Sequence, residues 1–450
     1  MADVTWVGAT AKQIARAVRR GDVTATQVVA DHLEQISITD PSLDAFRVVR
    51  AVEAITEAEK VDDQEDLSNL PLAGVPVAVK ENTAVAGLPT FSGSAAASTP
   101  VSEEDHEVVR RLRGAGAVVV GVTKMPEMGL WAVTDDADGP TRNPWDRDRT
   151  PGGSSGGAAA AVAAGLVPIA QCNDGMGSIR IPAACCGLVG LKPGRGVVPA
   201  ELGVDDWFGL VENGVLTTTV ADAALGFSVL AGRAPVRLVE PDKLRIGVST
   251  RSPVAGLGAD QPNLEAVGKA SKLLVRAGHD TVTAHPRYPV SLGIRATATW
   301  FASAYQESAR LDVASLQPRT RRHIALGKWA MRSGLVQQKH RDAWRAAAIK
   351  FFADNSLDLL LTPALAAAPP TAEQYSAGSW RRSMLVSVRS GTFVAPWNIA
   401  GLPAIVVPVG LRPDGLPLAV QLVGPPDSEL LLLAVAGQFE VLNPWQRHAY

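Results

Sequence analysis

Cysteine is scarce in this chain of 450 residues, which contains only Cys172, Cys185 and Cys186. An adjacent pair with one further cysteine does not form the disulfide framework of a small secreted protein. The sequence therefore predicts a reducing environment, and we expect a cytoplasmic location.

Long apolar runs are also missing. The longest run, from Ala158 to Ala170, is too short to span a bilayer and is interrupted by Gly165 and Pro168. The opening residues MADVTWVGATAKQIARAVRRGD lack the apolar stretch of a signal peptide. We therefore expect a soluble intracellular protein that does not associate with a membrane.

Neither charge is in excess, because 43 Lys and Arg residues stand against 45 Asp and Glu residues. Nucleic-acid-binding proteins normally carry a basic surplus, so nucleic acid is not an expected partner. Histidine is limited to seven residues, and no two of them have the spacing of zinc ligands. We predict neither a metal centre nor a cofactor.

The chain does contain an alternation of short apolar runs and helical patterns. Residues 75–79 predict a buried strand. Ser102 and Asp105 predict a capping box that begins a helix ending near Gly114. Residues 118–122 predict the next buried strand. A strand, a helix and a strand at this spacing indicate a right-handed crossover unit of an α/β sheet.

Further elements are predicted on both sides of this unit. Residues 9–36 favour two helices that separate near Gly21, and residues 155–165 favour an Ala-rich helix whose small side chains allow a central position. Residues 252–355 are more polar and helical. The remaining predicted elements are strands at 245–248, 357–361, 405–409 and 418–423 and a helix at 429–440. We interpret the chain as one α/β domain with a helical insertion.

A glycine- and serine-rich stretch, GGSSGG at 152–157, comes directly before the Ala-rich helix. A flexible linker is one interpretation, but structured segments flank it on both sides. A phosphate-binding loop would need a lysine after Gly157, and none is present. The stretch also fits the nucleophile pattern G-x-S-x-G at Ser154, although that class of hydrolase requires a histidine further along the chain. None of the histidines has a distinctive local setting.

A serine hydrolase can instead use lysine as its base. Burial disfavours the charged form of lysine and lowers its pKa, so that the neutral amine can accept a proton. Lys80 is the candidate, because it ends a predicted strand and α/β sheets place reactive groups at the carboxyl ends of parallel strands. The residues alone leave this assignment open, since most lysines at strand ends are solvated.

Four segments together resemble the amidase signature family over almost the whole chain. They are GVPVAVKEN at 74–82, TRNPW at 141–145 leading into PGGSSGG at 151–157, NDGMGSIRIP at 173–182 continuing to GLKP at 190–193, and PWNIAGLPA at 396–404 with GLP at 415–417 and Gln421. The resemblance implies one large amidase domain with a central mixed β-sheet flanked by helices. Its expected parts are an N-terminal helical cap at about 1–70, a catalytic core at 71–250, a variable helical region at 251–355 and the rest of the core at 356–450.

The resemblance assigns catalytic roles to three residues. Ser178 is similar to the acylated nucleophile, Ser154 to the serine that follows a cis peptide bond and relays the proton, and Lys80 to the base. Neutral Lys80 would accept a proton from Ser154, which would accept one from Ser178. Ser178 would attack the amide carbonyl, and water would later release the acid.

The turn before the nucleophile is expected to stabilise the oxyanion. One backbone N–H donor in such a site is typically worth about 3 kcal/mol. The expected donors are the N–H groups of Gly175, Met176, Gly177 and Ser178. The residues expected to support these turns are Ser155, Asp174 and Arg180.

The sequence departs from the family pattern at two positions. Met176 stands where the family usually has the first of two glycines, and Asn173 replaces the usual threonine. If position 176 needs a positive φ, a methionine there costs about 1–2 kcal/mol. Its side chain would also narrow or shape the acyl pocket, and neutral drift is the alternative. Because all three triad positions are intact, we expect an active enzyme.

The expected partner is a small-molecule amide of the linear type, from which ammonia or an amine is released. Ureido compounds are another substrate class of the family. The loop with Trp131 resembles the wall of the substrate cleft, and the other candidate wall residues are Met128, Ile181, Trp207 and Trp397. These side chains favour an apolar or aromatic acyl group.

Two other functions remain open at this point. The amidase-like subunit of the glutamyl-tRNA amidotransferase shares the triad, but residues 194–201 and 209–219 do not resemble that protein. A non-catalytic binding protein could also retain the fold, although an intact triad argues against it. A homodimer is expected only from the general frequency of dimers among oligomers.

Overall fold

The computed structural model describes residues 5–94 and 100–449, and one mixed sheet forms the centre of this part of the chain. Its strands are β1 (Phe46–Val49), β2 (Pro76–Lys80), β3 (Val118–Thr123), β4 (Ile169–Asp174), β5 (Val189–Lys192), β6 (Glu212–Thr217), β7 (Arg245–Val248), β8 (Asp280–Thr283), β9 (Leu359–Pro363), β10 (Ala404–Leu411) and β11 (Pro417–Val423). Their order in the sheet is β1-β3-β2-β4-β6-β5-β10-β11-β9-β7-β8. The pairs β2–β3, β2–β4, β7–β8 and β7–β9 are parallel, and the other pairs are antiparallel. The predicted α/β domain with a mixed sheet is confirmed.

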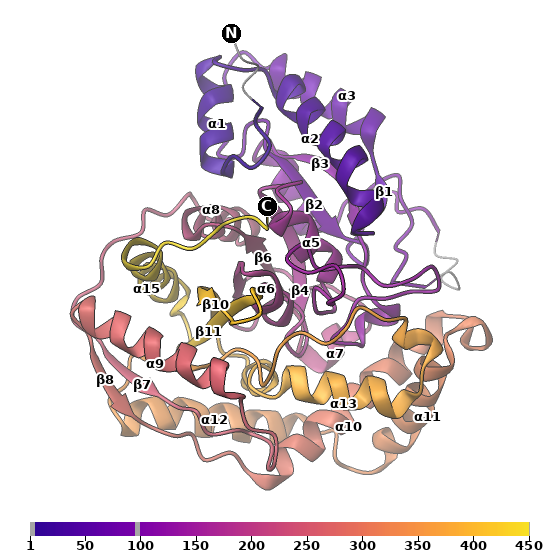
Figure 1. Cartoon of the computed structure of the whole chain (residues 1–450). Helices are drawn as coiled ribbons and strands as arrows, with labels where there is room; N and C mark the ends of the chain where they lie inside the picture. Colours follow the sequence, from indigo (N-terminus) through magenta and orange to yellow (C-terminus); the bar gives the residue numbers. More distant parts are fainter. Residues whose placement is uncertain (1–4, 95–99, 450) are drawn as a thin grey trace.

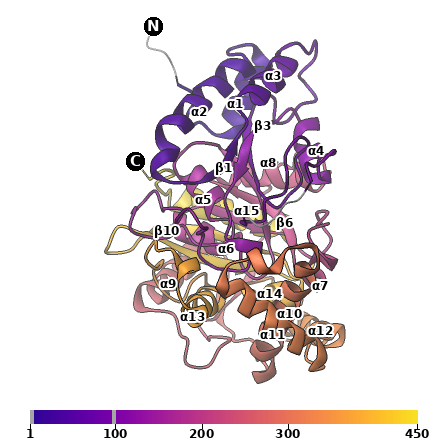
Figure 2. The same cartoon turned by 90° about the vertical axis from the view of Figure 1, so that its right-hand side faces the viewer.

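Helices from the whole chain surround the sheet. They are α1 (Ala11–Arg20), α2 (Ala25–Thr39), α3 (Ala51–Asp62), α4 (Glu107–Gly114), α5 (Gly156–Ala163), α6 (Arg180–Cys186), α7 (Asp205–Gly209), α8 (Val220–Leu230), α9 (Gln261–Arg276), α10 (Val290–Glu307), α11 (Pro318–Arg332), α12 (Gln338–Asp354), α13 (Trp380–Gly391), α14 (Ala395–Ala400) and α15 (Glu429–Leu442). Figures 1 and 2 place α1 to α3 beside β1 and β3, and α10 to α13 at the opposite end of the molecule. None of the helices in the described ranges is long and apolar enough to cross a membrane.

Helix α5 lies at the centre of the core, as its small side chains predict. All eight of its residues are buried. A Cβ added to Gly157 would lie only 2.4 Å from the carbonyl oxygen of Ala45 and 2.7 Å from the amide nitrogen of Lys124. Because two other segments pass this close, the first turn of the helix has no room for larger side chains. This packing fixes the turn that carries Ser154.

The crossover unit forms as predicted, because β2 and β3 pair in parallel and α4 lies between them in the chain. The predicted capping box is wrong. Helix α4 begins at Glu107, and the ring of its N-cap residue His106 accepts the N–H of Val108 at 3.2 Å. The Asp105 carboxylate instead accepts the N–H of Ala86 at 2.8 Å, so a contact distant in sequence replaces the local cap.

Candidate active site

Lys80 ends β2 in the interior of the protein, where its side chain has no exposed surface. Its Nζ donates hydrogen bonds to Ser154 Oγ at 2.7 Å and to Asn173 Oδ1 at 2.9 Å. Burial lowers the pKa of Lys80 to about 8, although the nearby carboxylates of Asp174 and Glu81 act in the opposite direction. A substantial share of Lys80 is therefore neutral at mildly alkaline pH.

Asn173 shows how the departure from threonine is accommodated. Its side-chain oxygen accepts from Lys80, and its amide nitrogen donates to Asn82 Oδ1 at 2.8 Å. The amide thus links the lysine to the segment that follows β2, which fixes the Nζ toward Ser154.

Ser154 lies in the turn before α5, and the peptide bond between Gly153 and Ser154 is cis. Ser155 joins this turn to the turn that contains Ser178, because the N–H of Ser155 donates to the carbonyl oxygen of Ser178 at 3.2 Å. Ser155 Oγ also donates to the carbonyl oxygen of Asn173 at 3.4 Å. These contacts place Ser155 between the two turns, and its supporting role stays a prediction.

Ser178 lies in the turn between β4 and α6, and Asp174 organises that turn. The Asp174 carboxylate accepts the N–H groups of Gly177 at 2.6 Å and Ile179 at 3.2 Å. It also forms a 2.9 Å ion pair with Arg180 in which both side chains are fully buried. Burial alone would raise the pKa of Asp174, but the charge and hydrogen bonds of Arg180 outweigh it and hold that pKa well below its usual range. Asp174 is therefore ionised wherever the protein is folded at ordinary pH.

Arg180 connects the same turn to the last part of the sheet. Its Nη1 donates to Gln421 Oε1 at 2.7 Å and to the carbonyl oxygen of Val394 at 2.8 Å. The Asn398 amide nitrogen donates to Asp174 Oδ1 at 2.9 Å. These contacts explain why the fourth sequence motif lies so far from the serines in the chain, since its polar residues fix the turn of Ser178.

The expected oxyanion donors differ in availability. The N–H of Gly177 is bonded to Asp174, so this expected donor is already engaged. Within the described residues, the N–H groups of Gly175, Met176 and Ser178 have no hydrogen-bond acceptor. These three groups are free to bind an oxyanion.

The methionine in this turn is not strained. Gly177 has the positive φ of 121°, whereas Met176 is not among the residues with positive φ. A Cβ on Gly177 would lie 2.4 Å from Val394 Cγ2, so the glycine is needed at that position and not at the preceding one. The conditional cost expected for Met176 therefore does not arise.

Ser178 borders two cavities of different character. The apolar cavity is lined by Trp131, Met176, Ile181 and Trp207 together with side chains of α10 and α13 and residues 395–399, including Leu292, Trp300 and Ile399. The polar cavity is lined by Ser154, Asn82, Asn173, Met128, Trp207 and the charged residues Glu201, Glu307 and Arg310. Ser154 and Ser178 both line the polar cavity, and their hydroxyls are not hydrogen-bonded to each other.

Trp131, Ile181 and Trp207 line the apolar cavity, whereas Trp397 does not. Its side chain has no exposed surface and packs against Trp344, with ring centroids 6.3 Å apart, and against Tyr288, at 6.5 Å. Trp397 borders neither cavity. The motif around it places the polar Asn398 toward the catalytic turn, so the adjacent ring points into a separate core.

Sequence reasoning missed the part of the wall that comes from the helical region. Trp300 and Leu292 of α10 line the apolar cavity, and Glu307 and Arg310 line the polar cavity. Trp300 is one of the few large aromatic residues of the predicted helical region, and this is a signal that could have identified it. The other residues have no such signal, since their position depends on how α10 packs.

The site combines a buried lysine that is hydrogen-bonded to a serine with a second serine and an apolar cavity. The Amidase family model matches residues 27–433, and the chain belongs to the amidase signature family of hydrolases that act on amides. The chain is 38% identical to AmiB2 of Mycobacterium tuberculosis, named as an amidase, over 98% of this chain and 97% of that protein. It is 33% identical to the acylamidase of Rhodococcus erythropolis over 98% of this chain and 96% of that enzyme. The solved structure of 6-aminohexanoate cyclic dimer hydrolase superposes with a TM-score of 0.86 at 29% identity and covers 98% of both chains.

Proposed function

We propose that this protein hydrolyses the C–N bond of a linear carboxamide through an acyl-enzyme on Ser178, with Ser154 as proton relay and Lys80 as base. The observation that carries the proposal is the 2.7 Å contact between Lys80 Nζ and Ser154 Oγ in a fully buried setting. Desolvation lowers the pKa of Lys80 to about 8, so the neutral amine is populated near this pH. The neutral amine is the form that can accept a proton.

In the acylation step, Lys80 accepts the proton of Ser154 while Ser154 accepts that of Ser178. Ser178 Oγ forms a bond to the amide carbonyl carbon. As the C–N bond breaks, the proton returns from Lys80 through Ser154 to the leaving nitrogen, and ammonia or an amine departs. Water then attacks the acyl-enzyme by the same relay and releases the carboxylic acid. The contact between the two serines closes when substrate is bound, as catalytic hydrogen bonds commonly do.

The oxyanion of the tetrahedral intermediate would bind N–H groups of Gly175, Met176 and Ser178. None of these groups has a competing acceptor among the described residues, and the bonds of Asp174 hold the turn before the reaction begins. Donors that need no reorganisation stabilise developing charge most effectively, and each contributes about 3 kcal/mol.

The two cavities support a substrate with an apolar group on one side of the amide and a more polar group on the other. The aromatic walls at Trp131, Trp207 and Trp300 fit the apolar side. The polar cavity, on the other side of the amide, is lined by hydrogen-bonding and charged groups that include Asn82, Glu201 and Glu307. The R. erythropolis relative is named an acylamidase, which agrees with a linear amide.

The test is turnover of a panel of amides by the purified protein, measured as released ammonia or amine. The panel contains acetamide, hexanamide, phenylacetamide, aliphatic anilides, a urea derivative and a cyclic diamide. Hydrolysis of the apolar linear amides, at least about tenfold faster than of acetamide, is the expected result. Turnover of the cyclic or urea compound alone would contradict the proposed substrate class. No turnover of any compound would revive the non-catalytic binding protein.

A further inference from the structure

The segment from Glu127 to Asp136, called here the Trp131 segment, passes directly beside Ser154. A Cβ placed on Gly129 would lie 3.4 Å from Ser154 Oγ. A Cβ placed on Gly153 would lie 2.6 Å from the carbonyl oxygen of Trp131. The backbone of the segment therefore packs on the turn of Ser154, and the Trp131 ring forms part of the wall of the apolar cavity.

The beginning of helix α11 binds both ends of the Trp131 segment. At one end, Glu127 Oε2 accepts the N–H of Gln317 at 2.9 Å. At the other end, Asp135 Oδ1 accepts from Arg319 Nη2 at 2.8 Å. These two contacts are separated by less than one turn of α11, so one short stretch of the chain binds both ends of the segment.

Arg319 contacts the Trp131 ring as well as Asp135. The side chains of Arg319 and Asp135 are both fully buried, and the guanidinium carbon lies 5.1 Å from the centroid of the Trp131 ring. This is the geometry of a cation–π contact, which is stronger in a desolvated site. Trp131 Nε1 has no hydrogen-bond partner within the described residues. The orientation of the ring therefore depends on Arg319 and on edge contacts with Trp300 at 5.8 Å and His323 at 5.2 Å.

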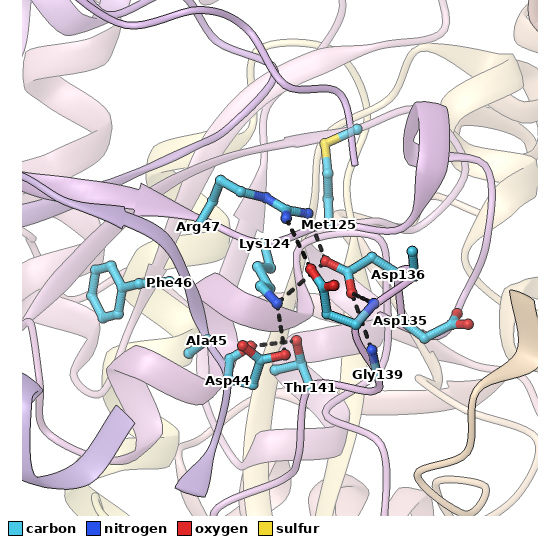
Figure 3. A network of polar contacts seen from close by, with 12 residues as sticks. Asp44, Ala45, Phe46, Arg47, Lys124, Met125, Asp135, Asp136, Gly139 and Thr141 are labelled. Carbon is cyan, nitrogen blue, oxygen red and sulfur yellow. Dashed lines mark hydrogen bonds and ion pairs between the residues drawn. The ribbon is translucent and has the colours of Figure 1, made fainter. Parts of the chain in front are cut away.

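The other side of the segment is held independently of α11. Asp136, the neighbour of Asp135, pairs with Arg47 at 2.6 Å and with Lys124 at 3.2 Å (Figure 3). Lys124 directly follows β3, and Arg47 belongs to β1. The two side chains therefore fix Asp136 to the edge of the sheet. Loss of the Arg319 contact would thus release the ring while the backbone next to it stays anchored.

We propose that Arg319 is a positioning residue that determines substrate specificity: it holds the Trp131 ring as a fixed wall and limits the size of the apolar group accepted beside Ser178. The role rests on the proposed hydrolysis at Ser178. It assigns to the helical region, through α11, control over which amides enter the apolar cavity.

The test compares Arg319→Lys with wild type. Lysine keeps a positive charge opposite Asp135 but lacks the planar surface that lies over the indole ring. The double variant Asp135→Asn with Arg319→Met removes both charges, so that neither is left buried alone. The control is Arg412→Lys, which changes the 2.9 Å pair with Asp260, two residues that border neither cavity. For each variant, kcat and KM are measured with the para-nitroanilides of acetic, butyric, hexanoic and octanoic acid, together with the thermal midpoint.

The expected result is a rise of about tenfold or more in the ratio of kcat/KM for octanoyl over acetyl anilide in Arg319→Lys. This rise should come mainly from KM, with kcat for the acetyl anilide changed less than about threefold. The same shift is expected in the double variant, and a ratio within about twofold of wild type is expected in Arg412→Lys. An Arg319→Lys protein with an unchanged ratio would overturn the proposal. If that variant does not fold, an unchanged ratio in the folded double variant would overturn it.

A second readout separates this proposal from the proposed function. The rates at which short-chain and long-chain alkyl fluorophosphonates label the protein depend on the cavity wall and not on amide turnover. If wild type hydrolyses neither these anilides nor any amide of the panel above, the proposed function fails, and the labelling ratio still tests Arg319. A labelling ratio that is equal in wild type and Arg319→Lys would contradict the role of Arg319.

Discussion

The two regions that meet at Ser178 hold their side chains in different ways. In the catalytic region, β2, β4 and their following turns bury the charges of Lys80, Asp174 and Arg180, and each has hydrogen-bond partners. In the region of α10 to α13, most of the side chains toward the apolar cavity are apolar or aromatic and are held by packing. Arg319 of α11 does not line this cavity; it lies over the Trp131 ring and pairs with Asp135 of the Trp131 segment.

We infer from this difference that the catalytic region determines the reaction and that the wall of the apolar cavity determines which substrate is accepted. A buried charge with several partners tolerates little change, because removal of one partner leaves the other uncompensated. An apolar wall tolerates substitutions of similar volume at lower cost. The catalytic region can therefore stay constant while the wall changes the substrate, and the variants below separate these two regions by their effects.

The largest effect is expected for the base. Lys80→Ala removes the proton acceptor of Ser154 and should lower kcat by about 10²- to 10⁴-fold on the best amide of the panel. The measurement is steady-state turnover together with a thermal midpoint that shows the variant is folded. Lys243→Ala, at a lysine with 64% of its side chain exposed, is the control and should retain full activity. A folded Lys80→Ala enzyme with more than a tenth of wild-type kcat would contradict the assignment of the base.

The next effect concerns the turn of Ser178. Asp174→Asn leaves the Arg180 charge buried without its partner, which should lower the free energy of unfolding by about 3–5 kcal/mol. Urea unfolding followed by far-UV circular dichroism measures this loss. In Asp260→Asn the remaining Arg412 keeps Asp414 as an ion-pair partner at 3.7 Å, and a loss of about 1 kcal/mol or less is expected. Equal losses in the two variants would show that the Asp174 pair has no special structural role.

The pH dependence follows from the same lysine. Because the pKa of Lys80 is lowered to about 8, kcat/KM should rise with pH and level off above that value. The unfolded chain binds more protons than the folded one between about 8 and the ordinary lysine value of 10.5, so the contribution of Lys80 to stability rises with pH across this window. A rate profile that inflects near 6.5, the usual pKa of histidine, would point to a different base.

A smaller effect is expected at the boundary of the two regions. Met176→Gly removes a side chain from the apolar cavity and leaves the backbone N–H in place. Because Met176 has no positive φ, the glycine relieves no strain, and the change should act on substrate preference. We expect the kcat/KM ratio of bulky to small acyl groups to rise by about tenfold. An unchanged ratio would leave Met176 as a neutral substitution.

Much of the catalytic region could be predicted from the sequence, because its chemistry depends on polar residues at fixed spacing within local motifs. The crossover unit, the central Ala-rich helix and the order of Lys80, Ser154 and Ser178 are readable in this way. Strand β4 could not be separated from the preceding helix, since residues 158–172 are almost continuously apolar and periodicity does not distinguish a buried strand from a buried helix. The engagement of the Gly177 N–H by Asp174 also depends on turn geometry that no motif specifies.

The substrate region was less predictable for a physical reason. Trp131 and Trp397 both stand beside family motifs, yet one ring lines the apolar cavity and the other is core. Their direction depends on the packing of α10 to α14 and not on local sequence. Likewise, the pairing of Asp135 with Arg319 joins residues that are 184 positions apart, and no pattern in either segment indicates it.

The most direct test of the account is the site of covalent labelling by a fluorophosphonate probe, read by mass spectrometry of the digested protein. We expect the added mass to lie on the peptide that contains Ser178 and to be absent in Ser178→Ala, and we expect labelling to slow strongly in Lys80→Ala. Mass found only on the peptide that contains Ser154 would contradict the assignment of Ser178 as the nucleophile.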